Sequence, residues 1–154
     1  MTEKNKSIKI GTIILLVMFI IGMVYGLFSI VYAESTAKSN YSLYTGKAWS
    51  EIIVSNPKLA QLYTEIIRLA GGLGIALQIA GFFILIAAFR KGKKWAWFCI
   101  LFITLIGWIS VLAHDIFLKD INFIIVDCVG LALLILGLAI PAKAILGKQR
   151  VEQF

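Results

Sequence analysis

The sequence has very few of the side chains on which metal binding, redox chemistry and acid–base catalysis usually depend. Its 154 residues include 2 cysteines, 2 prolines and 1 histidine, and only 15% are charged. Cys99 and Cys128 lie in different apolar segments without a Cys-x-x-Cys pair, which disfavours a thiol-oxidising membrane enzyme. His114 by itself cannot supply the paired axial ligands of a membrane cytochrome b. With no Gly-rich phosphate loop and no metal-spaced ligand cluster, no cofactor and no metal ion is expected.

Apolar residues are abundant instead, and they come in long blocks. Hydrophobic side chains make up 60% of the chain and the mean hydropathy is +0.93, whereas a soluble domain is nearer half apolar. Each block is long enough for a helix to cross about 30 Å of hydrocarbon. The sequence therefore predicts an all-α integral membrane protein, a single domain over 1–154 whose four transmembrane helices form an antiparallel bundle, at about 11–33, 62–89, 95–113 and 123–141. The first block is longer than the apolar core of a secretion signal, so we interpret it as a retained helix.

Lysine and arginine gather in the leader, in the loop at 90–94 and in the tail, while the other connections carry few. Basic loops stay on the cytoplasmic side of a membrane. We therefore expect both termini to be cytoplasmic and segment 34–60 to be extracytoplasmic, in a plasma or cytoplasmic membrane. The net charge of +7 comes mostly from this inner ring. It favours anionic lipid headgroups over nucleic acid as a partner, through Arg90, Lys91, Lys93 and Lys94.

A helix start precedes the second block. Asn56 suits an N-cap and Pro57 the first helical position, where the missing N–H costs nothing. The helix is expected to begin there and to extend a few turns beyond the membrane. Just before it, Trp49, Ile52 and Ile53 are expected to lie at the membrane interface or to cover the end of the bundle.

Small residues recur at helical spacing in the apolar blocks. In lipid, helices associate through close backbone approach, so small residues mark contact faces. The predicted packing positions are Gly22, Gly26, Gly71, Gly74, Gln78, Gly81, Gly130 and Gly137. Two interpretations are open: these faces hold one chain together as a bundle, or one of them, that of Gly22 and Gly26, binds a second copy.

A few charged side chains lie at one level near the extracytoplasmic ends of the helices. This predicted cluster contains Glu65, Arg68, His114, Asp115 and Asp127. Asp127 lies on the small-residue face of its helix, and an unpaired charge at membrane depth is costly. We therefore expect Arg68 to pair with Asp127, with Glu65 and His114 close by. The cluster is then either a structural clasp or a site open to the outside for a headgroup, a small ion or a proton.

Three classes of function fit these features. The first is a non-catalytic membrane protein, an accessory subunit or a self-associating scaffold, whose partners are other membrane subunits or itself. The second is an oligomeric transporter or channel for a small molecule or ion. The third is a lipid-binding or lipid-modifying enzyme, in which Asp127 would be the best candidate for a carboxyl with a raised pKa. The absence of catalytic motifs favours the first.

Overall fold

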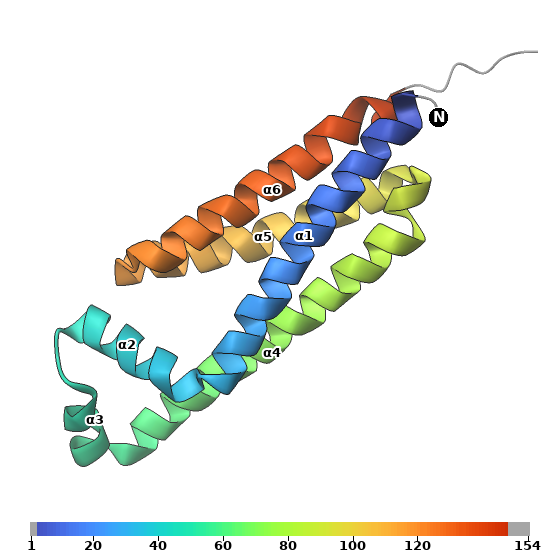
Figure 1. The fold of residues 1–154 in the computed structure, drawn as a ribbon. Coiled ribbons are helices and arrows are strands. Elements are labelled where there is room, and N and C mark those ends of the chain that lie inside the picture. Colours follow the sequence, from blue (N-terminus) through green and yellow to red (C-terminus); the bar gives the residue numbers. More distant parts are fainter. Residues whose placement is uncertain (1–2, 148–154) are drawn as a thin grey trace, which may run out of the picture.

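Four long helices make up most of the computed structural model, which describes residues 3–147 of the chain (Figure 1). They are α1 (Glu3–Val31), α4 (Pro57–Ala87), α5 (Lys94–Leu118) and α6 (Ile121–Leu146). All 4 are long and apolar enough to cross a membrane. The prediction of an all-helical protein with four membrane-length helices is therefore confirmed.

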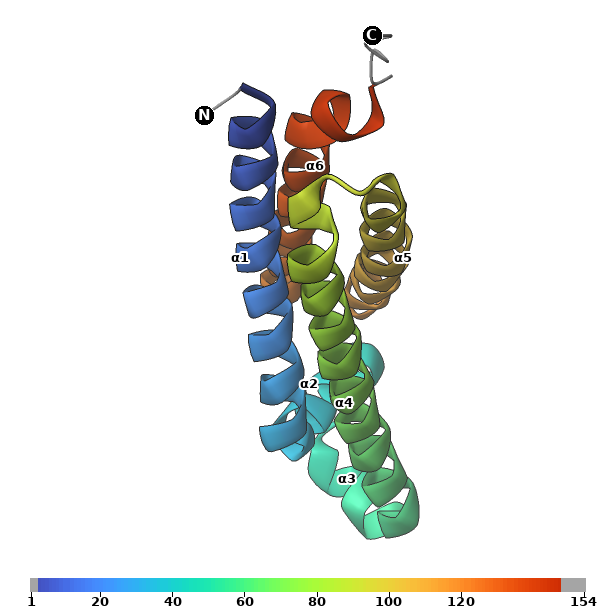
Figure 2. The same ribbon diagram turned by 90° about the vertical axis from the view of Figure 1, so that its right-hand side faces the viewer.

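The long helices form two pairs that separate toward one end. Helix α1 packs along both α4 and α6, and α5 packs mainly on α6 (Figures 1 and 2). In the described part of the chain, the backbones of α4 and α6 nowhere come within 8 Å of each other, Cα to Cα. Gly11 of α1 lies against Gly137 and Pro141 of α6, so α1 begins where α6 ends. We call this the terminal end of the molecule, and the opposite end, where α1 and α5 finish, the far end.

Two shorter helices at the far end replace the loop expected at 34–60. They are α2 (Ala33–Thr45) and α3 (Trp49–Ser55). Helix α2 ends at Gly46, whose φ of 69° is the left-handed conformation that glycine adopts without strain. A small apolar cluster of Ala37, Trp49, Ile52 and Ala60 joins these helices to α4. As expected, Trp49 and Ile52 cover an end of the long helices, whereas Ile53 is exposed.

The start of α4 matches the predicted helix signal. The Asn56 side chain accepts a hydrogen bond of 3.1 Å from the Leu59 backbone N–H, and Pro57 is the first helical residue. Because the helix begins this early, α4 extends past the end of α1 and runs beside α2 and α3 (Figure 2). This extension decides where the charged residues of α4 lie.

The helices approach one another most closely at glycines. A Cβ atom placed on Gly26 of α1 would lie 2.9 Å from the backbone oxygen of Gly71 in α4, so the two backbones touch there. Side chains cover most of the other predicted packing glycines: Gln78 at Gly22, Phe19 at Gly81, Trp108 at Gly130 and Leu15 at Gly137. The small-residue face of α1 is thus occupied within the chain, which leaves no room on it for a second copy. Gly74 is the exception in the predicted set, because its Cβ position has nothing within 4 Å.

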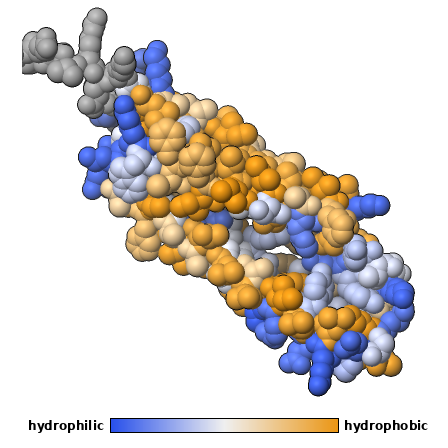
Figure 3. Space-filling model, turned by 180° about the vertical axis from the view of Figure 1, so that it is seen from behind, coloured by the Kyte–Doolittle hydropathy of each residue, from blue (hydrophilic) through white to orange (hydrophobic). Residues whose placement is uncertain are grey.

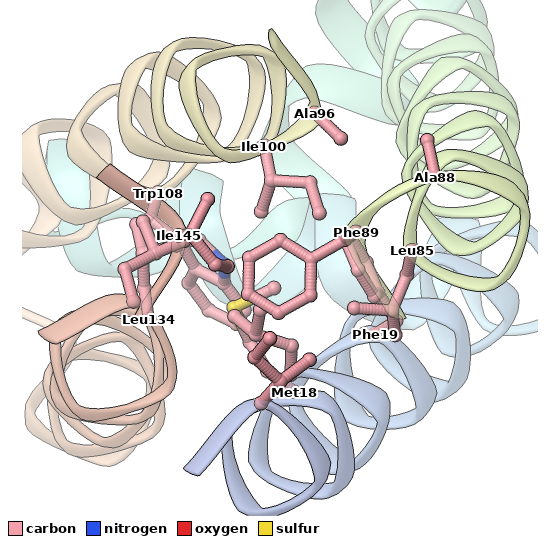
Figure 4. Close-up of a cluster of buried hydrophobic side chains, with 13 residues drawn as sticks. Met18, Phe19, Leu85, Ala88, Phe89, Ala96, Ile100, Trp108, Leu134 and Ile145 are labelled. Atoms are coloured by element: carbon pink, nitrogen blue, oxygen red, sulfur yellow. The ribbon is translucent and has the colours of Figure 1, made fainter. Parts of the chain in front are cut away.

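The apolar core fills the space between the four helices toward the terminal end. Phe89, in the short 3-10 helix η1 (Phe89–Lys91), points its ring among Met18 of α1, Ile100 of α5 and Leu134 of α6 (Figure 4). All four of these side chains are buried. On the face seen in Figure 3, apolar residues cover the middle of the molecule and polar residues gather toward its two ends. The core leaves the far end free for the polar residues described next.

Candidate functional site

The most unusual side chain in the described structure is Asp127 of α6. It is fully buried, with 0% of its surface exposed, and neither carboxyl oxygen has a hydrogen-bond partner. Helix α6 starts two turns earlier, where Asp120 accepts hydrogen bonds from the backbone N–H groups of Asn122 and Phe123. Asp127 then falls on the face that the helix buries throughout its length. The helix start and this periodicity together direct the carboxyl into the protein.

A second buried carboxyl, Asp115 near the end of α5, lies beside Asp127. Its exposed fraction is 3%, and its carboxyl is close enough to that of Asp127 for the two negative charges to repel each other. Buried residues recur along α5 at intervals of about one helical turn, and Asp115 continues that face. We call Asp115 and Asp127 the acid pair.

Tyr25 of α1 completes this layer. Its hydroxyl donates a long hydrogen bond of 3.5 Å to Oδ2 of Asp115. Its ring packs edge-on against Phe123 of α6, with the ring centroids 5.4 Å apart. Sequence reasoning did not include Tyr25, although its place one turn after Gly22 on a packing face was a usable signal. A tyrosine hydroxyl in an apolar segment needs a partner, and here that partner is a carboxylate.

Two more polar side chains lie one turn closer to the middle of the molecule. Gln78 of α4 rests on Gly22, which is three residues before Tyr25, and the ring of Trp108 in α5 rests on Gly130, three residues after Asp127. The Gln78 Oε1 and Trp108 Nε1 atoms are buried and have no hydrogen-bond partner. Most buried polar atoms in proteins are paired. Gln78 and Trp108 thus each leave one buried polar atom without a partner about one helical turn, measured along the helices, from Tyr25 and Asp127. We call Asp115, Asp127, Tyr25, Gln78 and Trp108 the polar site.

The other predicted cluster residues lie outside the polar site. Arg68 bonds to Glu65 one turn away on α4, and both side chains are about half exposed, at 46% and 53%. His114 is also exposed. The predicted pair of Arg68 with Asp127 is therefore not formed.

The reason is the path of α4. Gly71 lies opposite Ser29 and Ile30 near the end of α1, so Arg68 is roughly two helical turns beyond the level of Tyr25 and Asp127. Helix α4 has also diverged from α6, and within residues 3–147 no Cα of one lies within 8 Å of a Cα of the other. Equal depth estimated along the sequence was not enough to bring the two charges together.

The charge of the polar site is unbalanced. Within residues 3–147 the one salt bridge joins Arg68 to Glu65, so no Lys, Arg or His forms an ion pair with Asp115 or Asp127. Burying an ionised carboxylate without a partner is strongly unfavourable, and lipid surroundings make it worse. The described residues contain no group of three or more His, Cys, Asp and Glu side chains suited to a metal ion. The arrangement is suited to accepting a proton or a single positive charge.

One face of the molecule has a hollow. Figure 3 shows a hollow with paler, weakly polar residues between the apolar middle of the molecule and the end formed by α2 and α3. Comparisons with protein-family models, with curated proteins and with solved structures find no match to this chain. No similar protein therefore suggests a function, and the proposal below rests on the residues of the polar site.

Proposed function

We propose that the protein is a small polytopic membrane protein that binds a small, positively charged ligand at the acid pair, as a non-catalytic binding or transport subunit. The observation that carries this proposal is Asp127, which is fully buried and has no hydrogen-bond partner. Ionisable groups within membrane helices commonly mark ligand, ion or proton sites. A bound cation would supply the countercharge that the described part of the chain lacks.

The placement in the membrane is part of the same proposal. The four long helices cross the bilayer as an antiparallel bundle, with the terminal end cytoplasmic and the basic loop at anionic headgroups. The polar site then lies in the outer part of the membrane, toward the outside. Ligand reaches the acid pair from there, and the terminal-end core, with Phe89 at its centre, closes the inner side.

The orientation can be tested by thiol labelling in intact cells. Single cysteines at Thr2 and Gln153, positions outside the described residues, should resist an impermeant thiol reagent. A cysteine at Ser39, which is exposed on α2, should react readily. The background should lack Cys99 and Cys128. Labelling at Thr2 from outside would reverse the orientation and move the polar site to the cytoplasmic side.

Cation selectivity at the acid pair tests the function itself. In the same background, Asp127→Cys should react faster with a trimethylammonium methanethiosulfonate than with its sulfonate analogue, because Asp115 remains nearby to attract the cation. We expect a preference of about tenfold, equivalent to about 1.4 kcal/mol, after division by the ratio measured at Ser39→Cys. Adding Asp115→Asn should remove the preference. Equal rates with both reagents, or no reaction with either, would contradict a cation site reached from outside.

A second function, assembly with other subunits or with itself, is favoured by a different observation. Gly72 and Gly74 of α4 and Gly107 of α5 have no heavy atom within 4 Å of their Cβ positions. Small residues that are unused inside the chain allow close approach by a neighbouring helix in the membrane. On this proposal the contact lies on α4 and α5, instead of on α1.

A further inference from the structure

We propose that the ligand of the polar site is an organic ammonium carried on an apolar body. The ammonium nitrogen would lie between Asp115 and Asp127, and the apolar part would lie toward Trp108. This inference rests on the proposed function and specifies the chemical class of its ligand.

The polar site offers acceptors for N–H donors. Ionised carboxylates accept hydrogen bonds and donate none, and both oxygens of Asp127 are free to accept. The Tyr25 hydroxyl already donates to Asp115, which leaves its own oxygen lone pairs as acceptors. Gln78 leaves a further carbonyl oxygen unpartnered beside Gly22, which is one turn along α1 from Tyr25. A primary ammonium carries three N–H donors and one positive charge, which matches this set.

The number of oxygen ligands argues against a divalent metal ion. Calcium takes about six to eight oxygens and magnesium keeps near-octahedral geometry. The polar site has two carboxyls, one hydroxyl and one amide, and within residues 3–147 no third acidic, His or Cys side chain joins them as a metal-binding group. Asp120, the nearest other acid along the chain, is held by its bonds to the start of α6. A single charge with directed N–H donors is better matched.

The surroundings favour an apolar body on the ligand. The Trp108 ring lies over Gly130, one turn after Asp127 along α6. Tyr25 and Phe123 form an aromatic pair, and Phe123 is one turn before Asp127. Aromatic faces stabilise a nearby cation and pack against hydrocarbon. The Trp108 ring belongs to the apolar core, and its buried Nε1 has no hydrogen-bond partner in the described structure. A membrane-partitioning amine would place its ammonium at the acid pair and its apolar part against these aromatic residues.

The test uses octylammonium, octan-1-ol and sodium as matched probes. The full-length protein is placed in phosphatidylcholine nanodiscs, which contain no primary ammonium, and its unfolding temperature is followed as each probe is added. Octylammonium should give a saturable rise, because a ligand that binds only the folded state stabilises it. Asp127→Asn should weaken the apparent affinity at least about tenfold, the effect of losing about 1.4 kcal/mol of binding energy. Tyr25→Phe should weaken it less, and Glu65→Gln, which alters an exposed acid of α4, should leave it unchanged.

Each control separates one alternative. An equal rise with octan-1-ol would show purely apolar binding and overturn the proposal. An equal rise with sodium alone would overturn the organic ligand while leaving the proposed cation site intact. A rise that depends on Asp127 in phosphatidylethanolamine nanodiscs without added amine would support the ammonium chemistry and identify a lipid headgroup as its source. A further outcome is that no probe changes the unfolding temperature of the wild type while cation-selective labelling at residue 127 succeeds. That result would overturn the ammonium ligand and leave the proposed cation site intact.

Discussion

Replacing Asp127 with leucine is expected to stabilise the ligand-free protein. Leucine has the same branched shape as aspartate but no polar atoms, and Asp127 is fully buried with both oxygens unpartnered. An unsatisfied buried polar group costs about 1–3 kcal/mol, and more when it is charged. The free energy of unfolding should therefore rise by at least about 1 kcal/mol, measured by thermal unfolding in amine-free detergent. A residue that lowers the stability of the free protein is expected in a binding site.

The matched control is Asp120→Leu at the start of the same helix. Asp120 is an N-cap whose oxygen accepts from two backbone N–H groups. Its loss should destabilise the protein by about 0.5–2 kcal/mol. The two acids of one helix should thus give changes of opposite sign. A loss of stability in Asp127→Leu comparable to that in Asp120→Leu would mean that Asp127 is a structural group.

A double-mutant cycle extends this test to Arg68. Because Arg68 bonds to Glu65 and not to Asp127, the effects of Arg68→Met and Asp127→Leu should add within about 0.5 kcal/mol. A larger interaction energy would show that the two charges do meet in the membrane, and the acid pair would then have a counter-ion within the chain.

Gly26→Ile should be strongly destabilising, because Gly26 lies where the backbones of α1 and α4 touch. Its Cβ would lie 2.7 Å from Cγ1 of Ile75 and 2.9 Å from the backbone oxygen of Gly71, which cannot move without shifting the helix. Overpacking of this kind costs about 1–3 kcal/mol and sometimes more. Thermal unfolding of the detergent-solubilised monomer measures it.

Gly74→Ile is the matched control on α4, because its Cβ position is open. It should leave the unfolding temperature of the monomer nearly unchanged. If α4 carries the proposed subunit contact, Gly74→Ile should instead reduce crosslinked oligomer in the membrane. Equal destabilisation by Gly26→Ile and Gly74→Ile would contradict the packing described for α1 against α4.

Several features of this protein followed from the sequence by itself, because they depend on local pattern. In lipid, the backbone N–H and C=O groups of a long apolar segment find hydrogen-bond partners when the segment forms a membrane-length helix. Four such helices are present. Asn56 and Pro57 specify the start of α4 through backbone N–H groups that need a cap. The spacing of Asp127, Gly130 and Gly137 placed the acid on a buried face, since helical periodicity decides which residues share a face.

The neighbours of those residues were decided only by the tertiary structure. Local pattern gives the face and approximate depth of a side chain, but the crossing of the helices determines what lies opposite. Helix α4 follows α1 and leaves α6, so Arg68 remains at the surface with Glu65. Helix α1 instead brings Tyr25 to the acid pair. The polar site is therefore assembled from residues whose meeting no single segment encodes, because close packing at glycines such as Gly26 and Gly130 sets the helix positions.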